Sequence, residues 1–231
     1  MSLLLQQMMR RRREGGLTLL GGEVAYYPFD TPYVTPTSAL DVSGNGLHAA
    51  FVGTPAPTFP AGKVGDGCVA LNGSNYLNIA ASALHKFYQA DFSVAFWLNF
   101  GSWGPAIYTN IISRGGSSWR ITQKAALNTI NLTIPPTYSP EMTSATSVET
   151  GVWHHWAFVR DYTNSKAYIY HDGEIDKTIN SVTTVGTDVS AAVLIGKDPN
   201  SANYLTGSLD DVRLFNRALS AADVAALHAL A

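Results

Sequence analysis

Cysteine is nearly absent from the 231-residue chain, in which Cys68 is the single thiol. One thiol cannot form an internal disulfide, so the fold has to be held together by its core. Charged residues are also scarce, at 14% against about 25% in average globular proteins, while hydrophobic residues reach 46% and aromatic residues 11%. This balance excludes a disordered or coiled-coil protein. No apolar run approaches the roughly 18 residues that would span a bilayer.

Glutamate is also scarce. The chain has only five, at Glu14, Glu23, Glu141, Glu149 and Glu174. A paired acid and nucleophile is therefore difficult to assemble. The sequence also lacks a serine-nucleophile elbow, a phosphate-binding glycine loop and the spacing of zinc ligands. These absences favour a protein that is not an enzyme.

The positive charge is concentrated at one end, since four of the 15 Lys and Arg residues are consecutive. Without residues 1–14 the body keeps 11 basic and 16 acidic residues, a net charge of −5. A mildly acidic body has no basic face for nucleic acid, so we expect no nucleic-acid specificity. Apolar residues at helical spacing precede the arginines, which is the reverse of a secretory signal. Residues 1–22 are thus predicted to be a docking arm with a flexible glycine-rich join, whose contacts come from Leu4, Leu5, Met8, Met9, Arg10, Arg11, Arg12 and Arg13.

From residue 23 onward, short β-rich runs alternate with turn-forming residues, and residues 23–231 are predicted to form one domain. Alternation of apolar residues is strongest in 92–100, and Asp172-Gly173 is a strong hairpin signal because both turn positions require a positive φ. Ten strands are predicted, at 24–29, 68–71, 76–79, 92–100, 107–114, 129–134, 153–160, 167–171, 191–195 and 209–215. Ten strands in about 200 residues indicate two packed sheets.

One helix is predicted at the C-terminus. Ser220 and Asp223 form a capping box, and Leu219 is placed to pack on Val224. The helix carries a narrow apolar stripe, so we expect it to dock on the sandwich.

Eight phrases of the chain follow one another in a recognisable order. They are YYPFD (26–30), LDVSGNGLHAAFVG (40–53), GCVALNGSNYLNI (67–79), FSVAFWLNF (92–100), GVWHHWAFVRD (151–161), AYIYHDGEI (167–175), VLIGKD (193–198) and GSLDDVRLFNRALS (207–220). Together they resemble the phrases of the laminin G-like, concanavalin A-like family of lectins and glucanases. The resemblance covers about residues 23–230, although the segment 101–150 matches no phrase. It implies an all-β, two-sheet antiparallel sandwich of the jelly-roll type, with a short C-terminal helix and an N-terminal extension.

The turn from Asp41 to His48 is the first candidate site. Alternating Asp, Ser and Asn oxygens in a glycine-rich turn can surround a hard cation, and the resemblance implies that this segment supplies calcium ligands. Asp41, Asn45 and His48 are the residues expected to hold a Ca²⁺ ion. The alternative is that Asp41 and Asn45 only form Asx turns.

Asp210 is expected to complete the calcium site, because the resemblance places an Asp on a late strand next to the loop. Strand alternation predicts that it shares the core-facing side with Val212 and Leu214, where a carboxylate needs a cation or hydrogen bonds. The alternative is that Asp210 caps a neighbouring backbone segment.

Two other groups of polar residues are weaker candidates. His154 and His155 are adjacent on a strand, so they point to opposite faces and cannot hold one ion together. Residues 173–176 are similar to the carboxylate motif of β-glucanases with this fold, but Lys177 follows where those enzymes continue to a second Glu. Glu174 is expected to be solvated in the hairpin.

Ligand recognition is expected to come from exposed aromatic rings in loops, because sugars stack on rings and form hydrogen bonds with polar neighbours. The alternative for each ring is a place in the core of the sandwich. The candidates are Trp103, Tyr108, Trp119, Tyr138 and Tyr204.

We therefore predict a non-catalytic binding or adhesion module, carried on a larger assembly by its N-terminal arm. The absence of an export signal together with an adhesion-type domain suggests a bacteriophage virion protein, such as a head decoration, tail or fibre subunit. Its expected partners are other subunits of that assembly and a cell-surface glycan, and its expected location is the virion or an extracellular surface. The alternatives are a free lectin-like protein and a glycoside hydrolase of the same fold.

Overall fold

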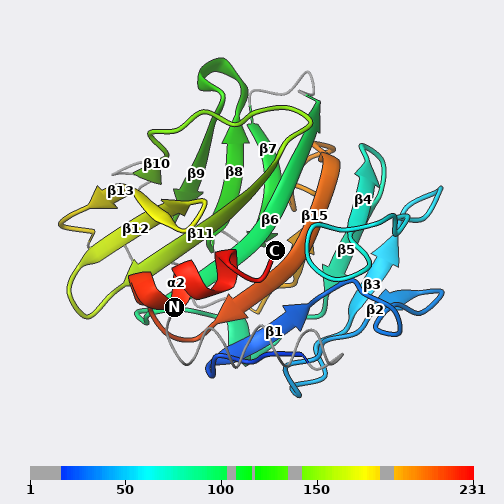
Figure 1. Ribbon diagram of the computed structural model, residues 1–231, viewed down its shortest axis with the longest axis horizontal. Helices are drawn as coiled ribbons and strands as arrows, with labels where there is room; N and C mark the ends of the chain where they lie inside the picture. Colours follow the sequence, from blue (N-terminus) through cyan, green and yellow to red (C-terminus); the bar gives the residue numbers. More distant parts are fainter. Residues whose placement is uncertain (1–16, 103–107, 116–117, 135–141, 183–189) are drawn as a thin grey trace.

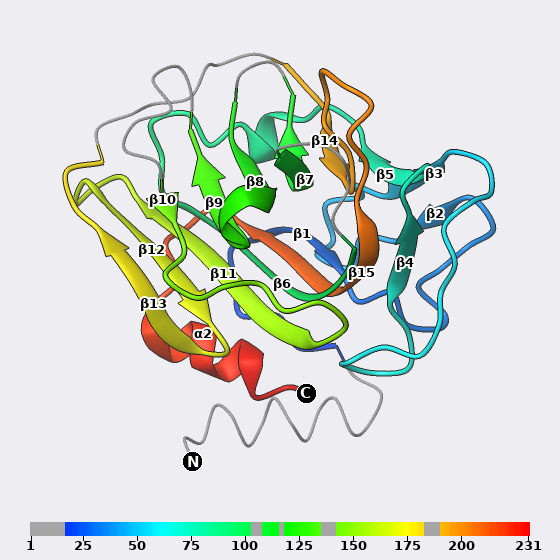
Figure 2. The ribbon, with the colours of Figure 1, turned by 90° about the horizontal axis from the view of Figure 1, so that it is seen from above.

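The computed structural model describes residues 17–102, 108–115, 118–134, 142–182 and 190–231. These residues form two packed antiparallel sheets, which Figures 1 and 2 show from two directions. The seven-stranded sheet runs in the order β1-β15-β6-β11-β12-β13, with β4 paired to β15. Its strands are β1 (Glu23–Tyr27), β4 (Val69–Asn72), β6 (Phe92–Ser102), β11 (Trp153–Asp161), β12 (Lys166–His171), β13 (Glu174–Ile179) and β15 (Thr206–Phe215).

The eight-stranded sheet runs in the order β10-β9-β8-β7-β14-β5-β3-β2. Its strands are β2 (Ser38–Ala39), β3 (Ala49–Val52), β5 (Tyr76–Ile79), β7 (Tyr108–Arg114), β8 (Arg120–Lys124), β9 (Thr129–Thr133), β10 (Met142–Thr143) and β14 (Val193–Ile195). Two short 3₁₀ turns, η1 (Ala83–His85) and η2 (Ala125–Leu127), lie in the connections. The predicted sandwich is confirmed. Each of the ten predicted strands is present, β5 with the predicted ends and the others with one or both ends shifted.

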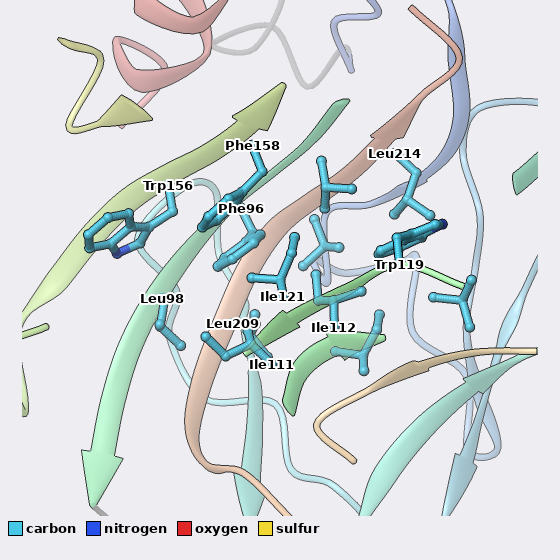
Figure 3. Packing of buried hydrophobic residues seen from close by; sticks show 14 of the residues in the cluster. Phe96, Leu98, Ile111, Ile112, Trp119, Ile121, Trp156, Phe158, Leu209 and Leu214 are labelled. Atoms are coloured by element: carbon cyan, nitrogen blue, oxygen red, sulfur yellow. The ribbon is translucent and has the colours of Figure 1, made fainter. Parts of the chain in front are cut away.

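The core lies between the two sheets, where alternate positions of each strand point inward (Figure 3). On β6, Phe96 and Leu98 face the other sheet and are at most 1% exposed. The residues between them, Ala95 and Trp97, point to the outer face instead. Both faces of β6 are covered over Val94–Leu98, which explains why every residue of this stretch is apolar.

The C-terminal helix α2 (Ala221–His228) packs on part of the outer face of the seven-stranded sheet (Figure 2). Ser220 and Asp223 form the predicted capping box, and Leu219 packs in the same cluster as Val224. We call this cluster the outer cluster; it consists of Ala95, Ala157, Val159, Tyr170, Phe215, Leu219, Val224 and Leu227. In the described part of the chain no helix has the length and apolar character needed to cross a membrane.

The join between the arm and the body is packed, contrary to the prediction of a flexible link, over residues 18–22. Thr18 is 4% exposed, and its carbonyl accepts a hydrogen bond of 2.7 Å from the buried guanidinium of Arg213. The backbone N–H of Leu20 donates to the Glu23 carboxylate at 2.6 Å. These contacts extend the folded body to at least residue 18.

Candidate functional site

A polar hollow of about 350 Å³ opens on the outer face of the eight-stranded sheet. Its size falls within the range of 300–1,000 Å³ typical of small-ligand sites. We call it the polar groove. The described residues that line it are Tyr108, Asn110, Arg120, Thr122, Thr133, Asp198 and Asn203.

Strand alternation places polar side chains in the polar groove. In β8, Ile121 packs in the core, so its neighbours Arg120 and Thr122 point outward. Asn110 on β7 lies directly opposite Thr122, and Thr133 on β9 lies opposite Arg120. Three neighbouring strands thus contribute one continuous polar surface.

The loop between β14 and β15 forms the rim of the polar groove. The backbone N–H of Asp198 donates to the carbonyl of Asn203 at 3.0 Å, and Asp198 Oδ1 accepts from the N–H of Asn200 at 2.7 Å. The amide nitrogen of Asn203 donates to the carbonyl of Tyr108 at 3.4 Å. The first two bonds order the loop, and the third holds it against β7.

Asn110 has the most unusual environment in the polar groove. It is 1% exposed, and its Oδ1 atom has no hydrogen-bond partner among the described residues. An unpaired buried acceptor costs about 1–3 kcal/mol, so native proteins keep few of them. Asn110 therefore offers a prepared acceptor to a donor that enters the groove.

One of the predicted aromatic rings lines the polar groove. Tyr108 is 41% exposed there, with Lys124 Nζ 5.7 Å from the ring centre. Tyr204 follows the lining residue Asn203 in sequence, but its ring packs 6.1 Å from that of Tyr76, and Lys197 Nζ is within 5.7 Å of both ring centres. Tyr108 is thus the ring best placed to contact a ligand.

The remaining aromatic predictions have different outcomes. Trp119 is 2% exposed and packs in the core against Phe87 and Phe92, so its prediction as a ligand-stacking ring is wrong (Figure 3). Trp103 and Tyr138 lie outside the described residues, as do the predicted docking residues Leu4, Leu5, Met8, Met9, Arg10, Arg11, Arg12 and Arg13.

The Asp41 loop is ordered by hydrogen bonds from the backbone. Asp41 Oδ1 accepts from the N–H groups of Tyr26 and Ser43 at 3.0 and 2.9 Å, and Oδ2 accepts from that of Leu47 at 2.9 Å. Asn45 donates to the carbonyls of Glu23 and Val24, while His48 Nδ1 accepts from the backbone N–H of Asp41. Asp41 is therefore satisfied as an acceptor by the protein itself.

Asp210 has a similar environment elsewhere on the sandwich. Its carboxylate accepts from the N–H groups of Lys63, Val64 and Asp211 at 2.7–2.8 Å. Burial, together with the charge of Asp211, raises the pKa of Asp210 to about 8 despite these three donors. In the described part of the chain, Asp41 and Asp210 share no hydrogen-bond partner.

The face of β15 on which Asp210 lies differs from the prediction. Asp210 is opposite Trp97 on the outer side, whereas Val212 and Leu214 pack in the core. A bulge between Asp210 and Arg213, with Asp211 at a φ of 49°, switches the alternation. The predicted Asp41–Asn45–His48–Asp210 calcium site stays a prediction, and a melting scan with calcium and with a chelator tests it: no change in Tm would refute it.

The two adjacent histidines lie on opposite faces of β11, as strand geometry requires. His155 is buried on the outer side, where its ring is 5.4 Å from Trp97, whereas His154 lies on the inner side next to His171. Glu174 is exposed in β13. Asp176 accepts from the N–H groups of Ala145 and Thr146, so it anchors a neighbouring loop.

Sequence reasoning missed every lining residue except Tyr108. The signal was present in the phrase RITQK at 120–124, whose odd positions are apolar or inward and whose even positions are polar. These residues come close to Asp198 and Asn203 only because β7 pairs with both β8 and β14. That pairing cannot be predicted from the sequence of any one strand.

Solved structures with the same fold include several binding domains. Domain 4 of AbnA, an extracellular arabinanase of glycoside hydrolase family 43 from Geobacillus stearothermophilus, was solved with arabinotriose; it is 21% identical, with a TM-score of 0.69 over 89% of this chain and 98% of that domain. The binding domain of Paraclostridial Mosquitocidal Protein 1 is 15% identical, with a TM-score of 0.71. The binding domain of botulinum neurotoxin DC in complex with SialylT is 15% identical, with a TM-score of 0.69.

This chain covers 52% of each of the two toxin binding domains, which in turn match 90% and 91% of this chain. No curated protein matches the chain significantly. The family model of the concanavalin A-like lectin/glucanases superfamily matches residues 71–225, more than half of the sequence and most of both sheets. The chain therefore belongs to the concanavalin A-like lectin/glucanase superfamily.

Proposed function

We propose that this protein is a non-catalytic glycan-binding module and that its ligand occupies the polar groove. The observation that carries the proposal is the buried Asn110 Oδ1, an acceptor without a partner among the described residues, in the same groove as the exposed ring of Tyr108. A sugar offers both complements: hydroxyl groups that donate hydrogen bonds and an apolar ring face that stacks on tyrosine.

The other lining groups suit a polar, uncharged ligand. Thr122 and Thr133 bring hydroxyl groups that donate and accept, and the Asn203 amide brings a donor near the rim. Arg120 and Asp198 contribute one charge of each sign, so the groove has no strong preference for an anion or a cation. Among the solved relatives, one domain is described with arabinotriose and another with SialylT, which supports a sugar as the ligand class.

A binding role is favoured over hydrolysis by the carboxylates at the groove. Glycoside hydrolysis needs two carboxyl groups about 5–9.5 Å apart across the scissile bond. Of the described lining residues, Asp198 alone carries a carboxylate, and its Oδ1 already accepts from Asn200. The groove can thus bind a sugar without the pair of groups that would cleave it.

A glycan array with the full-length protein, followed by titration with the best ligand, tests this proposal. Tyr108→Ala and Asn110→Ala are each expected to weaken binding about tenfold, since a stacked ring or a buried hydrogen bond contributes about 1 kcal/mol or more. Tyr88→Ala is the matched control, because Tyr88 is 42% exposed but lies away from the groove. Binding that survives Tyr108→Ala and Asn110→Ala, or that is lost in Tyr88→Ala, contradicts the assignment.

We also infer from the sequence of residues 1–14 that the module is carried on a larger assembly, with a phage virion as the favoured case and a free lectin-like protein as the alternative. The support is the arm's composition, in which an apolar Leu/Met segment precedes four arginines. Deleting residues 1–14 is expected to release the protein from the assembly and leave glycan binding unchanged. Normal incorporation of the truncated protein would refute the docking role of the arm.

A further inference from the structure

Three metal-ligating side chains meet on the inner face of β11 and β12, away from the polar groove. His154 Nδ1 is 2.8 Å from Asp172 Oδ2, and His171 Nε2 is 3.6 Å from the same oxygen. One ligand atom from each residue lies within 4.8 Å of the others. We call His154, His171 and Asp172 the histidine–aspartate cluster.

The hairpin fixes the positions of the cluster. His171 is directly opposite Trp156 in the β11–β12 pair, so His154 is its diagonal neighbour on the same face. Asp172 and Gly173 have φ values of 47° and 84°, which confirms the predicted hairpin turn and brings the carboxylate back over β11. The two strands and the turn thus hold three ligands on a rigid element.

A second contact fixes the orientation of the carboxylate. Asp172 Oδ1 accepts a hydrogen bond of 2.8 Å from the backbone N–H of His155, which leaves Oδ2 directed at the two imidazoles. Metal-binding carboxylates are commonly held in this way by a hydrogen bond to the other oxygen.

Hydrogen bonding alone does not account for all three side chains. The contact between His154 and Asp172 is a hydrogen bond, but the 3.6 Å between His171 Nε2 and Asp172 Oδ2 is too long for one. His171 Nε2 is buried and has no hydrogen-bond partner among the described residues. Buried ring nitrogens without a partner are uncommon and call for an explanation.

The spacing of the cluster is compatible with a tetrahedral metal site. Ligands about 2.0–2.2 Å from a zinc ion are about 3.4 Å from one another, and the two distances to Asp172 Oδ2 lie on either side of this value. The side chains are 16%, 19% and 35% exposed, so solvent can reach the cluster and supply a fourth ligand. Two imidazoles and one carboxylate form a donor set for a divalent transition metal rather than for calcium.

We infer that His154, His171 and Asp172 bind one divalent transition-metal ion, with zinc the best match to the geometry. The ion would link β11 to the β12–β13 hairpin and leave one coordination position open to water or to a ligand. This inference does not depend on the polar groove, which lies on the other sheet.

Titration of the untagged full-length protein with Zn²⁺, and with Co²⁺ followed by visible absorption, tests the inference. We expect one ion per chain, a rise in Tm with Zn²⁺, and an absorption band typical of four-coordinate Co²⁺. His171→Gln is expected to weaken binding at least about tenfold, because it removes a direct ligand. Asp172→Asn should act similarly while keeping the turn, since Asn tolerates a positive φ and can still accept from His155.

His228→Gln is the matched control. His228 lies against Gly173, but it comes from α2 on the opposite face of the sheet, so its loss should leave metal affinity unchanged. The inference is overturned if the wild-type protein binds no stoichiometric ion, if His171→Gln binds as tightly as the wild type, or if His228→Gln abolishes binding. Glycan binding by His171→Gln is expected to be normal, which separates this result from a failure of the groove proposal.

Discussion

Helix α2 covers part of the outer face of the seven-stranded sheet (Figure 2). The outer face of the eight-stranded sheet carries the polar groove instead. On the covered face, the outer cluster consists of apolar side chains, and those of Val224 and Leu227 are fully buried. On the open face, polar side chains project from β7, β8 and β9, and one of them keeps a buried acceptor without a partner among the described residues. The difference agrees with the proposed division of roles, in which one face contributes stability and the other binds the ligand.

The largest effect is expected from removing an apolar side chain of α2. Leu227→Ala should lower the free energy of unfolding by about 2–5 kcal/mol, because Leu227 is 0% exposed and its loss leaves a cavity. The same substitution at Leu127, which is 55% exposed, should change it by less than about 0.5 kcal/mol. Urea unfolding measures both values. Equal effects at the two positions would show that α2 does not seal the covered face.

Acidification is expected to lower the free energy of unfolding by an intermediate amount. The residue responsible is His155, which is buried on the covered face. Burial, with a contribution from the nearby His228, lowers the pKa of His155 to about 3 from an ordinary value near 6.5. Between these values the unfolded chain binds a proton that the folded chain does not. The stability contributed by neutral His155 is therefore present above about pH 6.5 and is lost as the pH falls towards 3, by at most about 1.4 kcal/mol per pH unit.

His155→Phe removes this proton, so its unfolding free energy should fall less steeply than that of the wild type below pH 6.5. Above pH 7 the two proteins should show the same slope, which serves as the internal control. Urea unfolding across this pH range measures the difference. Parallel curves from pH 7 to pH 4 would mean that His155 is not buried as a neutral residue.

The smallest effect is expected on the open face, and its sign is opposite. Asn110→Leu should raise the free energy of unfolding by about 1 kcal/mol, because it replaces a buried acceptor that has no partner among the described residues with an apolar group of similar size. The same variant should lose glycan binding. A decrease in stability would show that Asn110 serves the fold rather than the groove.

The parts of the fold that the sequence predicts well are the long apolar strands and the capped helix. Phe92 to Ser102 alternates clearly, and Ser220 with Asp223 forms a local capping signal, so neither depends on distant residues. Shorter strands such as β8 and β13 were missed, because Arg120–Lys124 and Glu174–Ile179 are rich in polar residues and resemble loops. These strands are defined by their partners rather than by their own composition.

The candidate sites are harder to predict, because register and bulges decide which side chains meet. Tyr108 was found through its ring alone, while Asn110 and Thr122 become neighbours only when β7 pairs with β8. Trp119 was predicted to lie in a loop but packs in the core. It directly precedes β8, a strand whose sequence shows no clear pattern. The bulge after Asp210 likewise moved that residue to the face opposite the one expected from alternation.

The position of β15 has a consequence for how the protein is made. This strand lies close to the C-terminus, yet it pairs with β1 near the other end of the chain and with β6 and β4 between them. These three strands therefore each lack a neighbour until Thr206–Phe215 has been synthesised. Because such non-local pairing is slow and exposes strand edges, the nascent chain should need protection from aggregation until β15 is available.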